Sequence, residues 1–259
     1  LSIRDEESRR DKEMAEKEPP KDKEFTFEIC AGRPGYLEAL DEERLVSLAR
    51  DAGAVFRLTR AKGGYILGEE VIFEATEKLD DETVGKMQEA ISIRSSRSQE
   101  SLVEFSINLL VEISLRALSP GVNDTFTAIA AVDSLSNALS QAAISDEARG
   151  AILRPDGEGN IRLVLIEPSM ENLINQAFHP LRQAAGNNIL MAICLARAYA
   201  RLCGTTGKHV QKPLEEHGLL LIRELELRCH LPEDIGNVVG YLPPAIQKAN
   251  KARVAKEKD

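Results

Sequence analysis

Aromatic side chains are scarce in this chain of 259 residues: tryptophan is absent and aromatic residues make up 4% of the total. So few rings leave little surface on which the bases of single-stranded nucleic acid can stack. The net charge at pH 7 is −9, and an acidic protein is a poor match for a phosphate backbone. The composition therefore argues against a nucleic-acid partner. Hydrophobic residues make up 43%, which is enough for a sizeable globular core at this length.

Paired cysteines and long apolar runs are also lacking. The chain has no C-x-x-C pair, which argues against a zinc site and favours free thiols in a reducing compartment. It has no run of about 18 apolar residues and no signal peptide. The cysteines are Cys30, Cys194, Cys203 and Cys229.

Histidines with metal-ligand spacing and phosphate-binding glycine loops are missing as well. The histidines are His179, His209, His217 and His230. None belongs to an H-x-x-x-H motif, and we expect each of them to be solvated. Gly63-Gly64 and Gly68 open no helix, so they predict hairpin turns and not a phosphate loop. The sequence thus predicts neither a metal site nor a bound cofactor.

Charge is concentrated at the two ends of the chain. Residues 1–24 hold sixteen charged side chains, too many for a packed segment, and predict a linker that is disordered or a solvated helix. Residues 247–259 predict a basic tail. The chain begins with Leu1 and not with Met, so we expect it to be an excised piece of a longer protein.

Residues 25–79 predict a small, mostly antiparallel β module with one helix. Alternation in Phe25–Ile29 is typical of a strand, and three further short strands are expected in 54–59, 65–67 and 71–75. Asp41 is placed to cap a short amphipathic helix that Gly53 ends.

Residues 80–246 predict a helical domain with one hairpin, so the expected fold class is α+β. A small β-rich N-terminal module is followed by a mainly α-helical bundle domain. The turn at 155–160 leads into a strand at 161–166. Helices are expected at 80–92, 99–118, 125–143, 169–184, 187–203 and 211–229.

The helix at 99–118 is apolar on nearly all sides, apart from a stripe of polar residues at every fourth position. We expect this helix to be the most buried element. Its stripe includes Glu112 and Arg116, an i,i+4 pair that we expect to be joined inside the bundle.

The turn after this helix gathers the candidate functional residues. Pro120 and Gly121 cannot continue a helix, and Asn123 and Asp124 can cap the next one. The candidate polar or ligand-binding cluster is Glu112, Arg116, Ser119, Asn123, Asp124 and Asp133. Secondary candidates are Arg97, Arg182 and Asn187.

Three roles are open for this cluster: a structural polar network, a ligand or ion pocket, and catalysis. Ser119 lacks the G-x-S-x-G setting of a nucleophile, and no histidine lies within fifty residues of it. Asp124 and Asp133 are nine residues apart and face different ways on one helix. No catalytic residue and no metal ligand is assigned.

The turn resembles the signature of a bacterial family of predicted multi-pass membrane proteins, catalogued as domain of unknown function 2254. The resemblance covers roughly residues 30–230. It rests on Arg116–Asp124, Thr127-Ala128, Asp133, Gly35-Tyr36, Asp41, Gly63–Gly68, Arg97-Ser98, Phe105 and Leu110–Ile113.

The resemblance implies a soluble C-terminal region that follows N-terminal membrane helices absent from this chain. An even number of spans would place it on the cytoplasmic side, in agreement with the unpaired cysteines. The family supplies no reaction. The chain has Ser101-Leu102 where the family has Gln-Asp, Thr125 where it has proline, and Ser134 where it has arginine. These departures weaken a catalytic or ion-pair role at those positions.

We therefore expect a cytoplasmic regulatory or assembly domain of a membrane protein such as a channel or transporter. The alternatives are a small-molecule-binding domain or enzyme that uses the polar cluster at the turn, and a pure interaction scaffold. A pocket onto which Arg116, Asn123 and Asp124 converge would favour ligand binding, whereas a fully satisfied network would favour a scaffold. We also expect a homo-oligomer, in the simplest case a dimer, held by apolar contacts.

Overall fold

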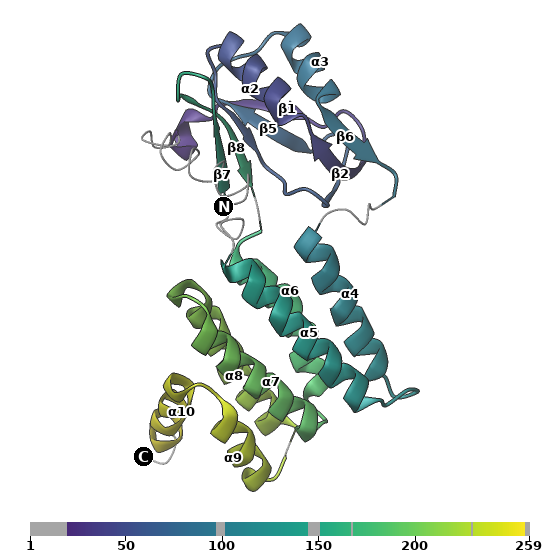
Figure 1. Cartoon of the computed structure of the whole chain (residues 1–259), viewed down its shortest axis with the longest axis vertical. Helices are drawn as coiled ribbons and strands as arrows, with labels where there is room; N and C mark the ends of the chain where they lie inside the picture. The colour runs from purple at the N-terminus through teal and green to yellow at the C-terminus, as the bar shows by residue number, and fades with distance from the viewer. Residues whose placement is uncertain (1–19, 97–101, 145–150, 167, 229, 257–259) are drawn as a thin grey trace, which may run out of the picture. The chain divides into compact units, whose positions relative to one another are not determined.

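The chain folds into two compact units in a computed structural model. The structure describes residues 20–96, 102–144, 151–166, 168–228 and 230–256. The first unit comprises the described residues within Leu1–Ser101 and Arg149–Pro168, and the second those within Leu102–Ala148 and Ser169–Asp259. The strands lie in the first unit and the second is helical (Figure 1), so the α+β class is confirmed.

The first unit holds two sheets, a 3-10 turn and two helices. The elements are η1 (Asp22–Glu24), β1 (Phe27–Cys30), β2 (Gly35–Leu40), α2 (Glu42–Asp51), β3 (Phe56–Leu58), β4 (Tyr65–Ile66), β5 (Val71–Ala75), α3 (Asp81–Glu89), β6 (Ile91–Arg94), β7 (Ala151–Pro155) and β8 (Ile161–Ile166).

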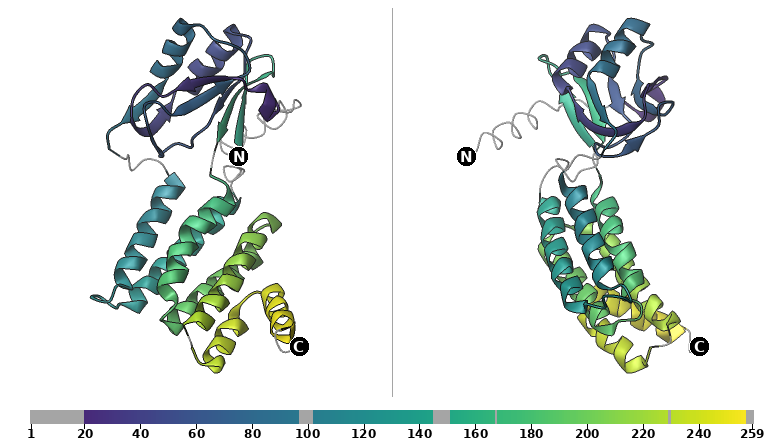
Figure 2. Two further views of the ribbon diagram at one scale, coloured as in Figure 1. Left: turned by 180° about the vertical axis from the view of Figure 1, so that it is seen from behind. Right: turned by 90° about the vertical axis from the view of Figure 1, so that its right-hand side faces the viewer.

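The larger sheet has the strand order β1-β5-β3-β8-β7. Its neighbours are antiparallel except β3 and β8, which are parallel, with Phe56 opposite Leu163. The smaller sheet has the order β4-β2-β6. Both helices lie on the same side of the strands (Figures 1 and 2). An ion pair of 2.7 Å between Arg44 and Glu89 joins them.

Local sequence accounts for the helix boundaries in this unit. The Asp41 carboxylate accepts the amide hydrogen of Arg44 at 3.0 Å, and Asp80 accepts that of Thr83 at 2.7 Å. Gly53 ends α2 with a φ of 64°, a conformation that glycine adopts without strain. Gly35 lets β2 approach β6 closely, because an added Cβ would lie 2.6 Å from the carbonyl oxygen of Arg94.

The second unit is a helical bundle in which α4 to α8 run side by side (Figures 1 and 2). Its core is formed by apolar side chains from these helices and from the two shorter ones at one end. The elements are α4 (Leu102–Ala117), α5 (Thr125–Ile144), α6 (Met170–Ala185), α7 (Ile189–Thr205), α8 (Lys208–Leu227), α9 (Pro232–Tyr241) and α10 (Pro244–Lys256).

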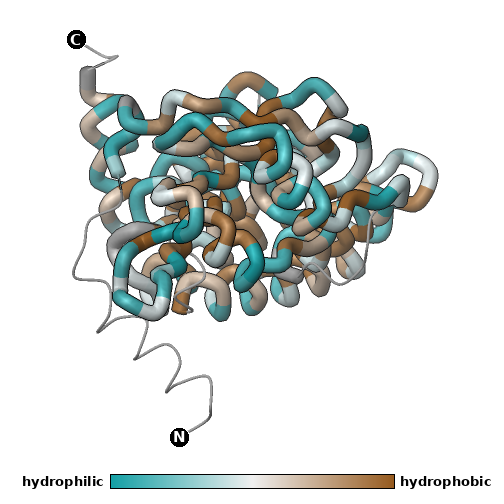
Figure 3. The backbone as a smooth tube through the Cα atoms, turned by 90° about the horizontal axis from the view of Figure 1, so that it is seen from above, coloured by the Kyte–Doolittle hydropathy of each residue, from teal (hydrophilic) through white to brown (hydrophobic). Residues whose placement is uncertain are grey.

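Hydrophobic and hydrophilic residues alternate along the helices and strands (Figure 3). Each element therefore has an apolar side, and these apolar sides pack together to form the two cores. In α7 the interior positions include Leu195, Ala198, Tyr199 and Leu202, which are at most 2% exposed. The helix α6 continues through Pro180 without a break.

Several elements differ from the sequence predictions. No strand was predicted at Gly35–Leu40, which forms β2. The expected helix at 80–92 ends at Glu89, and Ile91–Arg94 forms β6 beside β2. The helix α9 was not predicted at all. The hairpin at 151–166 belongs to the first unit and not to the helical domain, because β8 pairs with β3 and buries Leu163 and Leu165 in that core.

The helix α10 begins at Pro244, before the predicted basic tail at 247–259, and its first turn is packed against the bundle. Ile246 is 1% exposed, because α10 packs on α8 at Gly218. A Cβ on Gly218 would lie 2.4 Å from Cδ1 of Ile246, so this glycine is what allows the close approach.

Candidate functional site

The turn between α4 and α5 is held by its own backbone. The amides of Val122 and Asn123 donate to the carbonyl oxygen of Ser119 at 3.0 and 2.9 Å, and the amide of Asp124 donates to that of Ala117 at 2.8 Å. Asn123 has a φ of 48°, in the left-handed region that asparagine tolerates better than most residues. The sequence Ser-Pro-Gly-Val-Asn-Asp thus reverses the chain within one short loop.

Asp124 caps α5, as predicted. Its carboxylate accepts the amide of Thr127 at 3.0 Å and the hydroxyl of Thr127 at 2.5 Å. Both bonds lower the pKa of Asp124, and the bond from the Thr127 hydroxyl has the larger effect. Within the described residues, the Asn123 side chain makes no capping hydrogen bond to α5. Asn123 contributes instead through its backbone, whose left-handed conformation forms the turn. The Ser119 hydroxyl donates to the carbonyl oxygen of Arg116 at 2.7 Å.

Glu112 and Arg116 form the predicted ion pair, at 2.7 Å, but on the surface. The Glu112 side chain is 63% exposed and that of Arg116 is 75% exposed. The expectation that α4 is the most buried element is therefore wrong. The helix packs on α5 and α6 and turns its other face outward, where Leu109 and Ile113 are 46% and 40% exposed.

Two departures from the family pattern have local roles. The Thr125 hydroxyl accepts a hydrogen bond of 2.8 Å from the side-chain amide of Asn188. Because Asn188 also caps α7 through the amide of Met191 at 3.0 Å, this bond ties the turn to the start of α7. The Ser134 hydroxyl donates to the carbonyl oxygen of Ala130. Ser101 and the Leu102 side chain lie outside the described part.

Asp133 does not join the turn residues but faces α7. Its carboxylate accepts a hydrogen bond of 2.6 Å from Arg201, and both side chains are at least half exposed. This pair borders a groove of about 450 Å³ between α5, α7 and α9. The groove is lined by Ile129, Asp133, Leu190, Ile193, Cys194, Arg197, Ala200, Arg201 and Tyr241.

Sequence reasoning missed the arginines of this groove. Six of its lining residues lie on one face of α7, between Leu190 and Arg201, and the signal was two arginines four residues apart on an otherwise apolar helix. The guanidinium of Arg197 lies over the ring of Tyr241, 4.2 Å from its centroid. Burial raises the pKa of Cys194 to about 11, with Asp133 adding to the effect, so this thiol is a neutral part of the wall.

Of the secondary candidate residues, Arg182 and Asn187 take part in one set of contacts between α6 and α8. Arg182, 8% exposed, pairs with Glu224 of α8 at 3.2 Å. Glu224 also accepts from Arg228, which donates to the Asn187 side chain at 3.3 Å. These contacts fasten the end of α6 to α8. Arg97 lies outside the described residues.

Three buried polar atoms have no partner within the described part of the chain: Nε of Arg182, Oη of Tyr199 and Nδ1 of His217. His217 is 1% exposed, which contradicts the expected solvated histidine. Its Nε2 lies 2.9 Å from Oδ1 of Asn175. Burial first, and then electrostatic repulsion from His179 and Arg182, lower the pKa of His217 to about 4, so the His217 ring is neutral at pH 7.

The described residues contain neither a group of three His, Cys, Asp or Glu side chains that could hold a metal ion nor a helix with the length and hydropathy needed to cross a bilayer.

Comparison with known proteins gives a family and two relatives. The profile of a family described as "Predicted membrane protein (DUF2254)" matches residues 2–201. An uncharacterized protein of Mycobacterium bovis and one of Mycobacterium tuberculosis are each 24% identical to the chain over 204 residues. Each alignment covers 74% of this chain and 38% of the relative, so the chain spans well under half of either protein. No solved structure matches. The chain belongs to the DUF2254 family of predicted membrane proteins.

Proposed function

We propose that this chain is the soluble, cytoplasmic part of a multi-pass membrane protein of the DUF2254 family, where it acts as a regulatory or assembly domain. The family description supplies the membrane protein. The observation that carries the proposal is that each unit closes a hydrophobic core of its own. A domain built this way is stable in water without help from lipid.

The surface of the first unit supports an aqueous location. Ion pairs such as Arg44–Glu89 and Arg50–Asp51 leave at least two fifths of each side chain exposed. Exposed ion pairs of this kind require contact with water. The free-energy cost of moving an ion into hydrocarbon is far larger than the stabilisation that the pair provides. The unpaired thiols of Cys30, Cys194 and Cys203 fit the reducing cytoplasm.

The outward face of α4 supports an assembly role. Leu109 and Ile113 are exposed there beside the Glu112–Arg116 pair, and Phe126 at the start of α5 is 77% exposed. A second copy suits this face, because an isologous contact brings one patch against itself. Apolar groups can then meet while Glu112 of one copy approaches Arg116 of the other. We propose a homodimer formed through this face.

The polar cluster at the turn is better explained as a scaffold than as an active site. Ser119 and Asp124 are engaged by Arg116 and Thr127, and Asp133 pairs with Arg201 of another helix. Satisfied local bonds of this kind fix helix geometry. An enzyme or small-molecule site at the turn would require its residues to converge on a shared space, and the groove lies instead along α7.

Cysteine accessibility in the full-length protein tests the location. A variant without native cysteines receives a single cysteine at the exposed residue Glu82, and a membrane-impermeant maleimide is added to intact and to permeabilised cells. The proposal predicts labelling after permeabilisation only. Labelling in intact cells would place the domain on the other side of the membrane.

Light scattering over a concentration series tests the assembly. An Ile113→Glu substitution should shift the association of this chain to at least tenfold higher concentration, because a charge would be buried at the contact. Leu227→Glu, at a site that is 72% exposed on α8, is the matched control and should have no effect. Association should survive high salt. A monomer at all concentrations would rule out this face as a dimer contact.

A further inference from the structure

The groove between α5, α7 and α9 holds an arginine that no carboxylate of the described residues neutralises. Among the described residues, Arg197 has the Tyr241 ring as its contact and forms no ion pair. The guanidinium lies over one face of the ring, a cation–π contact that favours this position of the side chain. The donor edges of a stacked arginine remain available, and they match the two oxygens of a carboxylate.

The charges that line the groove leave one positive charge in excess. Its charged lining residues are Arg197, Arg201 and Asp133, and Asp133 is already paired with Arg201 at 2.6 Å. Two arginines one helical turn apart on α7 repel each other, so an anion between them is favoured. A single excess charge suits a monoanion better than a dianion.

The remaining wall is apolar. Ile129 from α5 and Leu190, Ile193 and Ala200 from α7 line it, and Leu190 is 45% exposed in spite of its size. The volume of about 450 Å³ lies in the range of small-molecule sites, which combine apolar walls with a few polar groups. An apolar body that covers Leu190 and Ile193 would remove this surface from water.

We propose that this groove binds a monocarboxylate with an apolar body of several carbons, its carboxylate on Arg197 and its body against Leu190 and Ile193. This inference does not depend on the membrane location or on the dimer. The residues that carry it belong to one unit and to three helices of that unit.

Three small probes separate charge from hydrophobicity in calorimetric titrations of the whole chain. Octanoate has both features, octanol has the body without the charge, and inorganic phosphate has charge without the body. We expect saturable octanoate binding with an affinity at least tenfold above that of octanol or phosphate, since a charge-assisted hydrogen bond contributes about that factor. In a ¹⁵N-labelled sample, octanoate should shift the amide signals of Leu190–Arg201.

An Arg197→Gln variant tests the assigned anion contact. It should weaken octanoate binding about tenfold or more and leave octanol binding unchanged. Arg223→Gln, an exposed arginine of α8 outside the groove, is the matched control and should bind octanoate like the parent chain. If Arg197→Gln fails to fold, Arg197→Lys keeps the charge but loses the planar fork, and a smaller loss of affinity is expected.

Equal affinity for octanol and octanoate would overturn the proposal, because the groove would then be a plain apolar surface. So would phosphate binding as tight as octanoate binding, or octanoate binding that Arg197→Gln leaves intact. Amide shifts confined to residues outside α5, α7 and α9 would assign the ligand to another site and would also refute it.

Discussion

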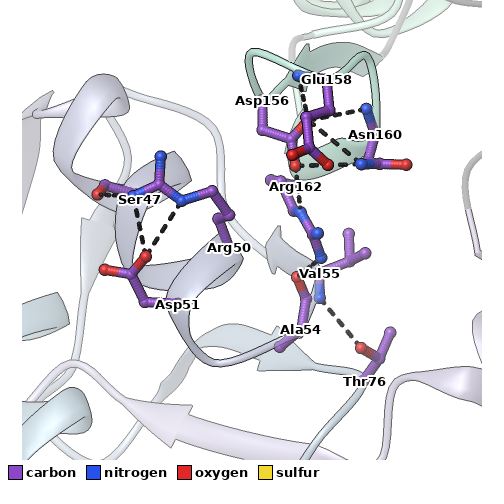
Figure 4. Close-up of polar contacts among 10 residues, drawn as sticks. All are labelled: Ser47, Arg50, Asp51, Ala54, Val55, Thr76, Asp156, Glu158, Asn160 and Arg162. Atoms are coloured by element: carbon purple, nitrogen blue, oxygen red, sulfur yellow. Dashed lines mark hydrogen bonds and ion pairs between the residues drawn. The ribbon is translucent and has the colours of Figure 1, made fainter.

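The two units treat buried polar groups differently. In the first unit the carboxylate of Asp156, a residue only 4% exposed, accepts bonds from Arg162 at 2.8 Å and from the amides of Glu158 and Asn160 at 3.0 Å (Figure 4). In the second unit Arg182, Tyr199 and His217 each leave a buried atom without a partner among the described residues. Unsatisfied polar atoms and exposed apolar side chains both cost stability, and natural proteins accept such costs mainly where function requires them.

The two units also differ in how many large apolar side chains they expose. The large hydrophobic residues exposed in the described part of the first unit are Tyr65 and Leu67, whereas the second unit exposes many more, on α4, α5, α7, α8 and α9. The first unit is therefore a satisfied, self-contained fold. The second unit carries most of the exposed large apolar residues of the described part of the chain.

Removing the Asp156 carboxylate should produce the largest effect and would sharpen the comparison. Arg162 is 18% exposed in its side chain, so Asp156→Ala would leave a partly buried charge unpaired and should lower the free energy of unfolding by about 3 kcal/mol. Urea denaturation followed by a probe in the first unit measures it. Asp51→Ala, which breaks the exposed pair with Arg50 seen in the same view (Figure 4), is the control and should cost about 0–1 kcal/mol. If both variants lost the same free energy of unfolding, the hydrogen bonds of Asp156 would contribute no more than an exposed ion pair.

Acid should destabilise the second unit through His217. Its pKa is about 4 in the folded state against an ordinary value of 6.5, so the unfolded chain binds more protons between these values. Stability is then complete above pH 6.5 and is lost as the pH falls toward 4, by up to about 3 kcal/mol. Thermal unfolding across this pH range measures how steeply stability falls with pH. This dependence should be weaker in His217→Gln. An unchanged pH dependence in that variant would show that a group other than His217 causes it.

Local signals in the sequence account for much of the fold. The caps at Asp41 and Asp124 and the stop at Gly53 depend on neighbours within a few residues, and they were predicted correctly. The parallel pairing of β8 with β3 depends on residues about a hundred positions apart, and no local pattern specifies it. For that reason the hairpin at 151–166 was expected in the helical domain and not in the first unit.

The candidate site could be predicted only in part. The Glu112–Arg116 pair follows from its spacing, but its exposure does not, because spacing along one helix does not specify which of its faces the neighbouring helices cover. Phe126 at the start of α5 is likewise 77% exposed although its side chain is large and apolar. The burial of His217 arises from packing between α6, α7 and α8, with the rings of Phe178 and Tyr199 around it, and spacing along α8 does not reveal it.

A smaller effect is expected at the turn. Asp124→Ala should lower the free energy of unfolding by about 1 kcal/mol, since the carboxylate satisfies the Thr127 amide as a helix cap. Asp124→Asn should recover most of that loss. A thermal shift equivalent to several kcal/mol would show that Asp124 anchors a wider network than the structure contains.

The smallest effect should come from the exposed ion pair on α4. Arg116→Ala should change the stability of the monomer by a few tenths of a kcal/mol, as for other i,i+4 pairs. The same variant should weaken association more clearly if Arg116 meets Glu112 of a second copy. Denaturation of dilute protein and sedimentation of concentrated protein separate the two effects.

Hydrogen exchange at low and high protein concentration tests most directly the claim that contact surfaces lie in the second unit. The account predicts that exchange slows with concentration in peptides from α4 and from the α4–α5 turn through Phe126, while peptides from β1 to β6 and from the β7–β8 hairpin exchange at unchanged rates. Slowing confined to the first unit would contradict it.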